Sequence, residues 1–313
     1  MSENRSPSDQ MPSYEGRPLV RPHEDLVDQG LSFDLTTLLN RRQVLRAFGL
    51  GAAAVGLAAC GGGGTASNSS SSATTSASVA SGEIPDETAG PYPGDGSNGP
   101  DVLEQSGIIR SDIRSSFGSA SGTARGVPMQ LELVIKDLAS GGGGFKGVAV
   151  YVWHCDRDGR YSLYSEGITN ENYLRGVQVA DADGRVRFTS IFPACYSGRW
   201  PHVHFEVYPD KSSITDDSKV IATSQVALPK DTCAQVYAQT GYQQSVANLS
   251  QVSLEDDNVF GDDGGKSQLA TVAGDVTSGL NVSLTVGVDT TTTPTGGQGV
   301  PPPGASGGPT SSS

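Results

Sequence analysis

The sequence predicts an all-β domain, namely an antiparallel β-sandwich with few short helices. Short runs rich in Val, Ile, Thr and aromatic residues recur between residues 129 and 286, and this composition is typical of β-strands. Gly, Asp, Ser and Pro separate the runs, as turns between strands require. Only one intervening segment is a plausible helix. Short strands joined by turns therefore favour a sandwich or a barrel.

The expected strands are runs of apolar residues with partial alternation, the pattern of a half-buried strand. In chain order they are MQLELVIKD (129–137), KGVAVYVWHC (146–155), GRVRFTSIF (184–192), PHVHFEVY (201–208), KVIATSQVAL (219–228), QLATVAG (268–274) and LNVSLTV (280–286).

Turns and one helix connect these strands. DRDGR (156–160) and DADGR (181–185) are expected to be Asp-Gly turns. PKDTCAQVYAQ (229–239) is the expected helix, with Pro229 near its start, where the fixed backbone angle of proline suits a helix. DDNVFGDDGG (256–265) holds many carboxylates but lacks the spacing of an EF-hand loop, so we expect a solvated acidic loop.

Composition divides the 313 residues into four parts. Residues 61–82 are almost all Gly, Ser, Thr and Ala, and residues 288–313 are similar with Pro added. Neither segment can bury enough apolar surface to offset the entropy of ordering, so both are expected to be disordered. One folded domain with a single core is expected between residues 83 and 287. Residues 1–60 carry a targeting signal.

The targeting signal lies in NRRQVLRAFGLGAAAVGLAAC (40–60), where paired arginines precede an apolar run too short for a comfortable membrane span. It resembles a twin-arginine export signal fused to a bacterial lipoprotein cleavage box. We expect lipidation at Cys60, export, and anchoring on the outer face of the bacterial cytoplasmic membrane, with the Gly/Ser segment as a tether. A short buried helix is the alternative. Either Met1 or Met11 can be the start.

Charge and cysteine content narrow the function and the redox state. The net charge is −13, and no basic cluster occurs beyond the N-terminal signal, which argues against nucleic-acid binding. An exported domain can form disulfides, and its cysteines are Cys155, Cys195 and Cys233. We favour a Cys195–Cys233 bridge, with Cys155 as a small core residue, although the sequence leaves the pairing open.

Two of the four histidines in the chain, His202 and His204, lie one residue apart in an expected strand. Alternate residues of a strand share a face, so the two imidazoles point the same way while Val203 and Phe205 face a core. Their backbones are about 7 Å apart, close enough for both side chains to bind one metal ion. The alternative is a pair of structural histidines.

The residues nearby allow two kinds of metal site. A zinc or copper site would recruit Glu206, His154 or Cys195 as a further ligand. Tyr161 and Tyr196, near strand ends, are the other candidates. A phenol has a high pKa, so a strongly Lewis-acidic ion such as ferric iron is needed to deprotonate it. Surface packing is the ordinary role of each tyrosine taken alone.

Three blocks resemble the intradiol ring-cleavage dioxygenases, the family of catechol 1,2-dioxygenase and protocatechuate 3,4-dioxygenase. They are VWHCDRDGRY (152–161), GVQVADADGRVRFTSIFPACY (176–196) and GRWPHVHFEVY (198–208). The resemblance covers most of residues 85–228 and implies a β-sandwich enzyme with one non-haem Fe(III). Such an enzyme uses O₂ to cleave a catechol-type aromatic to a muconate-type diacid.

The resemblance also implies roles for individual residues. The implied iron ligands are Tyr161, Tyr196, His202 and His204. Tyr196 would also act as a base, Arg199 would lie over the substrate ring with Gln225 beside it, and Tyr92 would line the pocket.

The same resemblance leaves other properties open. Tyr196 and His202 are only six residues apart, a shorter connection than in the best-studied members, so a more open active site is expected. A non-catalytic, surface-anchored sandwich that binds phenolics or a protein partner is the alternative function. The substrate and the oligomeric state are not specified.

Overall fold

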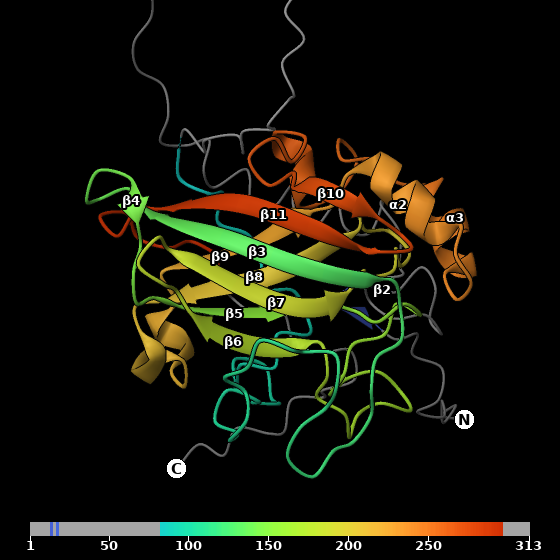
Figure 1. The fold of residues 1–313 in the computed structure, drawn as a ribbon, viewed down its shortest axis with the longest axis horizontal. Helices are drawn as coiled ribbons and strands as arrows, with labels where there is room; N and C mark the ends of the chain where they lie inside the picture. The colour runs from blue at the N-terminus through green and yellow to red at the C-terminus, as the bar shows by residue number, and fades with distance from the viewer. Residues whose placement is uncertain (1–12, 15–16, 19–81, 297–313) are drawn as a thin grey trace, which may run out of the picture.

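The computed structural model describes residues 82–296, together with residues 13–14 and 17–18 (Figure 1). The expected export signal, Cys60 and nearly all of the Gly/Ser tether lie outside the described residues. Of the described N-terminal residues, β1 (Ser13–Tyr14) pairs antiparallel with β2 (Arg17–Pro18). In the described part of the chain, no helix is long and apolar enough to span a membrane.

Two sheets form the domain, and they are layered as the sequence predicts (Figure 1). The first sheet has the order β10-β11-β3-β4, with β7 also paired to β3; its strands are β3 (Pro128–Asp137), β4 (Gly143–Gly144), β7 (Arg185–Ile191), β10 (Thr271–Asp275) and β11 (Gly279–Val288). The second has the order β6-β5-β8-β9; its strands are β5 (Ala149–Trp153), β6 (Arg175–Val179), β8 (His202–Tyr208) and β9 (Ala222–Ala227). Every pairing in these two sheets is antiparallel except β11 with β3. The predicted all-β sandwich is confirmed.

The main core lies between the two sheets, where alternate residues of facing strands meet. Leu131 and Leu133 of β3 and Val150 and Val152 of β5 belong to it, and so does Phe205 of β8. Alternation places every second residue of each strand in this core and leaves the rest on the outer faces of the sheets.

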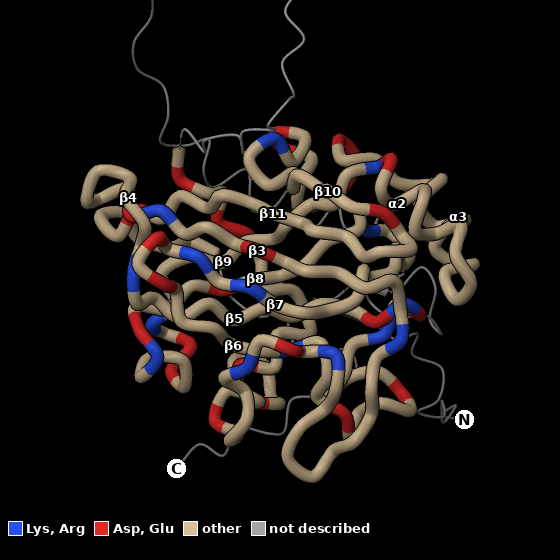
Figure 2. Tube along the Cα trace, viewed as in Figure 1, with Lys and Arg blue, Asp and Glu red and all other residues tan. Residues whose placement is uncertain are grey.

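The two outer faces differ in what covers them. On the first sheet, Arg185 and Arg187 of β7 form ion pairs with Glu132 of β3, and charged residues lie along these strands (Figure 2). On the second sheet, Tyr151 and Trp153 pack in a second buried cluster with residues from the connections before β3 and after β5. Every residue of β8 is consequently buried, whichever face it occupies. The outer face of the second sheet is therefore shielded from solvent, as a buried active site requires.

Each expected strand is present, but several described elements were not predicted, among them the two-residue strand β4, the strand β6 and the helix α3 (Gln243–Leu249). β6 is short and its sequence, RGVQV, begins with an arginine that turns out to be buried. α2 (Lys230–Tyr237) is the expected helix, and Pro229 is its N-cap. α3 was missed because its sequence, QQSVANL, is mostly polar. Single-turn 3₁₀ helices complete the described elements: η3 (Lys211–Ser213), η4 (Asp217–Lys219) and η5 (Phe260–Asp262).

Both predicted Asp-Gly turns are present, but neither closes a hairpin within one sheet. The turn at 181–185 leads from β6 in the second sheet to β7 in the first. Asp181 Oδ1 accepts hydrogen bonds from the backbone N–H groups of Asp183 (2.9 Å) and Arg185 (2.9 Å), and Gly184 has a φ of +80° that glycine adopts without strain. The turn therefore carries the chain between the two layers.

The folded domain continues past the expected boundary at residue 287. Thr292 Oγ1 donates to Glu83 Oε1 (2.6 Å), and the backbone N–H of Thr295 donates to Asp86 Oδ2 (2.7 Å). Residues 288–296, expected to begin a disordered tail, thus bond to the first residues of the domain. Residues 297–313 lie outside the described part.

The favoured Cys195–Cys233 disulfide is wrong in this structure, since Cys155, Cys195 and Cys233 are all free and buried. The Cys195 thiol points to the carbonyl oxygen of Arg199 (3.5 Å), and the Cys233 thiol points to that of Leu228 (3.8 Å). Each thiol faces a backbone carbonyl of its own neighbourhood. Burial raises the pKa of the Cys195 thiol to about 12, which keeps it protonated.

Candidate active site

The candidate site starts from the two histidines of β8, which share the outer face of the second sheet as predicted. Their Nε2 atoms are 3.0 Å apart, and both side chains are almost fully buried. The Nδ1 atom of His202 lies 2.5 Å from the carbonyl oxygen of Trp200, which can only accept a hydrogen bond. The proton of His202 therefore resides on Nδ1, and its Nε2 presents a lone pair to the site.

The two predicted tyrosines converge on the same point. Tyr196 Oη lies 3.2 Å and Tyr161 Oη 3.5 Å from His202 Nε2, although Tyr161 is 41 residues away in the chain. Four candidate ligand atoms, two phenol oxygens and two imidazole nitrogens, thus meet in one buried place. His204 is further held by Trp153, whose ring stacks on the imidazole with centroids 4.9 Å apart and an interplanar angle of 6°.

Local hydrogen bonds set each tyrosine in position. Tyr161 follows a tight turn in which Asp156 Oδ1 accepts from the backbone N–H groups of Asp158 (2.9 Å) and Arg160 (3.0 Å). Its own backbone N–H donates to Ser165 Oγ (2.9 Å). The Asp-Gly turn that the sequence predicted thereby aims the first tyrosine at the histidines.

The unpredicted helix α3 sets the second tyrosine. The residue before Tyr196 is Cys195, whose backbone N–H donates to Ser245 Oγ (3.0 Å) and whose carbonyl accepts from Asn248 Nδ2 (2.8 Å). Both partners belong to α3. The mostly polar sequence of this helix, which hid it from prediction, is what allows it to hold the Tyr196 segment.

Burial makes these four groups neutral in the absence of a cation. It lowers the pKa of His202 to about 3 and that of His204 well below its ordinary value, so both imidazoles keep a lone pair. It raises the pKa of Tyr196 to about 12 and that of Tyr161 well above its ordinary value. Only a strongly Lewis-acidic cation would offset the cost of two buried phenolates.

This donor set fits ferric iron. Two phenolates and two neutral imidazoles would leave one net positive charge on the ion, and phenolate is a hard donor suited to Fe(III). His204 Nδ1 is buried and has no hydrogen-bond partner among the described residues. Because His202 Nε2 presents a lone pair 3.0 Å from His204 Nε2, the proton of His204 lies on Nε2 in the absence of a cation, and it would move to Nδ1 when Nε2 binds a metal ion.

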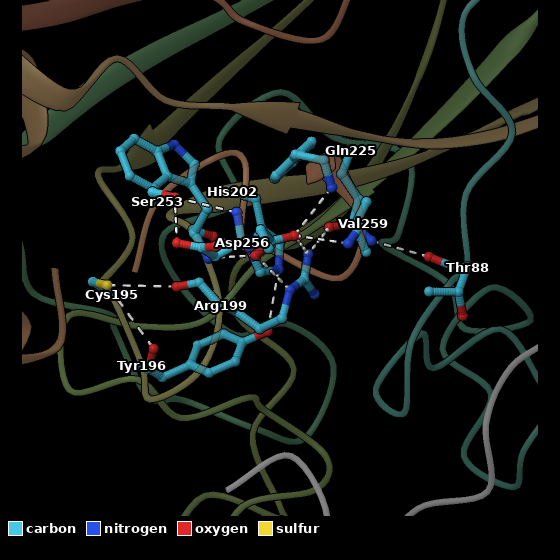
Figure 3. Close-up of polar contacts among 12 residues, drawn as sticks. Thr88, Cys195, Tyr196, Arg199, His202, Gln225, Ser253, Asp256 and Val259 are labelled. Carbon is cyan, nitrogen blue, oxygen red and sulfur yellow. Dashed lines mark hydrogen bonds and ion pairs between the residues drawn. The ribbon is translucent and has the colours of Figure 1, made fainter. Parts of the chain in front are cut away.

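Arg199 and Gln225 lie together beside this cluster, as the sequence resemblance implied (Figure 3). Arg199 Nη2 donates to Gln225 Oε1 (2.7 Å), and Gln225 Nε2 donates to the carbonyl oxygen of Thr88 (3.1 Å). In the register of the second sheet, Gln225 pairs with His204 across β8 and β9, which places both on one face. Arg199 is buried rather than free in solvent.

Asp257 is the main site residue that sequence reasoning missed. Its carboxylate accepts from Arg199 Nε (3.0 Å) and from the backbone N–H of Trp200 (2.6 Å), Val259 (2.8 Å) and Phe260 (3.1 Å). Burial alone would raise its pKa, but the Arg199 charge holds it below the ordinary value. The expectation of a solvated loop at 256–265 is therefore wrong at this residue. The apolar Val259-Phe260 pair was the available signal for burial.

Tyr92 also reaches the site. Its ring stacks on that of Tyr161, with centroids 4.8 Å apart and an interplanar angle of 29°. Near it, Gly90 approaches His204 so closely that a Cβ atom would lie 3.4 Å from His204 Cε1, and its φ is +73°. The segment before β3 thus covers the tyrosine and histidine rings with little space to spare.

The alternative zinc or copper ligands do not join the cluster. His154 bonds through Nδ1 to the carbonyl of Cys155 (2.8 Å) and through Nε2 to Ser190 Oγ (2.7 Å). Glu206 shares the face of His204, but it accepts from Tyr208 Oη (2.9 Å), and burial raises its pKa well above the ordinary value. The Cys195 thiol faces carbonyl oxygens, as described above. Within residues 82–296, no group of three or more His, Cys, Asp and Glu side chains is arranged to hold a metal ion.

The sequence and the fold of this chain were also compared with those of known proteins. Residues 98–206 match the family model described as Dioxygenase. Chlorocatechol 1,2-dioxygenase of Rhodococcus opacus is 40% identical over 50 residues, a stretch that covers 16% of this chain and only 20% of that enzyme. The intradiol ring-cleavage dioxygenase from Tetranychus urticae superposes with a TM-score of 0.52 at 23% identity, over 67% of this chain and 95% of that one. The fold is that of an intradiol ring-cleavage dioxygenase, and the family resemblance predicted from the sequence blocks is confirmed.

Proposed function

We infer that this chain is an intradiol ring-cleavage dioxygenase, and we propose that it binds one ferric ion through Tyr161, Tyr196, His202 and His204. Its reaction would join a catechol-type aromatic with O₂ and open the ring between the two hydroxylated carbons to give a muconate-type diacid. The observation that carries the proposal is the convergence of both phenol oxygens on His202 Nε2, at 3.2 and 3.5 Å, beside the His204 ring.

Ferric iron held there would supply a Lewis acid that binds both catechol oxygens and makes the ring reactive toward O₂. The chain itself supplies the proton acceptor. Tyr196 lies at the edge of the cluster in the short connection to His202, and its Oη is placed to take a proton from a substrate hydroxyl. Tyr161 is more deeply buried and stacked under Tyr92, which suits a ligand that stays in place.

Arg199 supplies the charge that stabilises the reacting ring. The ion pair with Asp257 raises its pKa above the ordinary value against the opposing effect of burial, so the guanidinium stays protonated at all ordinary pH. Gln225 and Asp257 fix it from two sides before substrate arrives. A preorganised cation of this kind is worth about 2–4 kcal/mol of barrier at a site shielded from water.

The substrate class is broader than unsubstituted catechol in this proposal. A polar hollow of about 410 Å³ lies against Tyr196, and its walls include Arg157 from the turn before Tyr161 and Gln244 and Asn248 of α3. Tyr196 and His202 are only six residues apart, which is the short connection from which the sequence predicts a more open site. Catechols with a substituent on the ring are therefore the substrates that we would test beside catechol.

The reaction itself tests the proposal. With catechol and ¹⁸O₂, the purified protein should consume one O₂ per catechol and give a diacid that carries both labelled atoms. Tyr196→Phe should lose most of this turnover, whereas Tyr237→Phe should keep it, because the Tyr237 hydroxyl lies in the core, where it donates to the carbonyl of Pro193 (3.2 Å). Extradiol products, or full turnover by Tyr196→Phe, would contradict the assignment.

We also propose that the enzyme acts outside the cytoplasm as a lipoprotein. The support is the sequence of residues 40–60 alone, with its paired arginines, apolar run and Cys60. Expression of Cys60→Ser in a bacterial host should release the protein from the membrane fraction. Continued membrane association of that variant would count against a lipid anchor at this residue.

A further inference from the structure

We propose that Arg175 is a positioning residue of this site, one that holds Tyr92 against Tyr161. The proposal rests on the proposed function, because Tyr161 matters here as an iron ligand and Tyr92 as a wall of the substrate pocket. Arg175 opens β6, and only 1% of its surface is exposed. Neither the sequence blocks nor the ligand set assigns it a role.

The guanidinium of Arg175 makes five hydrogen bonds, three to backbone carbonyl oxygens and two to side-chain hydroxyls. Nε donates to Ser162 Oγ (3.1 Å), and Nη2 donates to the carbonyl oxygens of Ser162 (3.0 Å) and Tyr92 (2.9 Å). Nη1 donates to the carbonyl of Pro93 (2.6 Å) and to Tyr151 Oη (2.9 Å). All five N–H groups of the guanidinium therefore have an acceptor.

Apart from the Tyr151 hydroxyl of β5, these acceptors belong to two segments that are about 70 residues apart in the chain. One segment carries Tyr92, and the other carries Ser162, the residue directly after Tyr161. The guanidinium thus clamps the backbone at both members of the stacked ring pair. A shift of the backbone at Tyr92 would move the ring that covers Tyr161. A shift at Ser162 would move Tyr161 itself, and with it the phenol oxygen that points to His202.

The cost of this arrangement argues that the contact is specific. Among the described residues, no carboxylate lies within ion-pair distance of Arg175, so a cation is buried with neutral partners alone. An apolar side chain would fill the same space without a desolvation penalty. Only a planar fork with five donors can join three carbonyl oxygens and two hydroxyls at once, and lysine cannot replace it.

The fold also makes room for the guanidinium. A Cβ atom on Gly94 would lie 2.8 Å from Arg175 Nη1, and Gly94 has a φ of +66°. In the register of the second sheet, Arg175 pairs with Trp153, and Trp153 pairs with His204. The positioning residue, the ring that packs on His204, and His204 itself therefore form one row across three strands.

The test compares Arg175→Lys and Arg175→Met with a matched control, Arg110→Lys. Arg110 is half-buried and also donates to backbone carbonyls, those of Ser115, Asn172 and Arg175, so it supports β6 but makes none of the Arg175 hydrogen bonds to Tyr92 or Ser162. The measurements are iron loss to a chelator, the visible ferric-tyrosinate band, KM and kcat for catechol, and the melting temperature.

The expected result for both Arg175 variants is a shifted band, faster iron loss and roughly a tenfold rise in KM, since small misplacements at a site are costly. Arg110→Lys should change the melting temperature at most. Wild-type values for the band, iron loss and KM in both Arg175 variants would overturn the proposal. So would equal changes in those readouts in Arg110→Lys, because that pattern means general loosening of β6.

If the Arg175 variants fail to fold, Gly94→Ala takes their place. Its Cβ atom would lie 2.8 Å from Arg175 Nη1 and 2.9 Å from Leu163 Cδ1, so the guanidinium must shift while keeping its charge and donors, and the same signature should appear at smaller size. A normal band and KM in a folded Gly94→Ala protein would overturn the proposal. Failure of the proposed function looks different, since a wild-type protein that takes up no iron overturns both inferences at once.

Discussion

Asp257 Oδ2 lies 3.0 Å from Arg199 Nε across a separation of 58 residues, and the pair is buried beside the candidate metal ligands. The same carboxylate accepts three backbone N–H groups from residues at or near both ends of this ion pair. The Asp257 carboxylate therefore holds Arg199, and backbone N–H groups hold that carboxylate in turn. The contact explains how a long, flexible side chain can stay fixed in the site.

Replacing Asp257 by Asn is expected to lower kcat for catechol more than it raises KM, because the substitution removes a charge partner of Arg199 and one of its acceptors. Loss of a buried, charged hydrogen bond costs about 1.5–3 kcal/mol, which corresponds to roughly a 10- to 150-fold slower reaction. Steady-state kinetics with catechol measure the effect.

The matched control is Asp256→Asn, one residue earlier. Asp256 is exposed and accepts from Ser253 Oγ (2.8 Å), a contact marked in Figure 3. It should keep wild-type kinetics. Equal losses in both variants would show that the loop as a whole matters, and that the Asp257–Arg199 contact does not.

Iron retention separates the site histidines from the third buried histidine nearby. His202→Ala and His204→Ala should each lose bound iron, since either change removes one of four ligand atoms. His154→Gln should keep it, because His154 bonds to the Cys155 carbonyl and Ser190 instead. Metal analysis of the purified proteins decides the matter. Full iron content in His202→Ala would remove that residue from the ligand set.

Stability should fall as the pH rises toward 8 because of Glu87. Burial raises the pKa of this carboxyl to about 8, and nearby Asp262 adds to the effect. Between its ordinary pKa of about 4.5 and 8, the folded protein holds a proton that the unfolded chain has lost. The stability linked to Glu87 is therefore complete below 4.5 and is lost as the pH rises through 8.

Urea unfolding at several pH values from 4.5 to 9 measures this dependence. Glu87→Gln should flatten the decline, whereas Glu104→Gln, at an exposed position, should leave it unchanged. The Glu87 carboxyl lies 3.5 Å from Gln268 Nε2, a contact that the glutamine side chain can keep. An unaltered pH profile in Glu87→Gln would exclude this residue as the source.

The three cysteines of the domain should be protected thiols. Without reductant, alkylation of the native protein should leave Cys155, Cys195 and Cys233 unmodified, because all three are buried with raised pKa values. Alkylation after denaturation, still without reductant, should label all three peptides. Absence of label on Cys195 and Cys233 in the denatured protein would indicate the disulfide that the structure lacks.

The sequence was sufficient for much of the fold and the centre of the site, and the reasons are local. A period of two along PHVHFEVY places His202 and His204 on one face and Phe205 in the core without any tertiary information. The Asp-Gly turn at 156–160 was predicted from its own residues, and the three sequence blocks identified Tyr161 and Tyr196 as candidate ligands. These features depend on a few neighbouring residues, which a sequence displays directly.

What the sequence concealed depends on contacts between distant segments. Asp257 looks like one of several loop carboxylates until Arg199 is placed beside it. Arg175 begins a short strand, and its partners lie near residues 92 and 162. α3 has no apolar stripe from which a helix could be predicted. Its polar residues Ser245 and Asn248 instead hydrogen-bond to the backbone of Cys195. Polar residues with tertiary partners carry no periodic signal.

The central claim is that two tyrosines and two histidines bind a ferric ion that in turn binds a catechol. It is tested most directly by the visible absorption spectrum of the iron-quantified protein, recorded before and after anaerobic addition of catechol. The account predicts one iron per chain and a ferric-tyrosinate band that shifts when catechol is added. A protein that stays colourless after reconstitution with iron, or a band that catechol leaves unchanged, would contradict it.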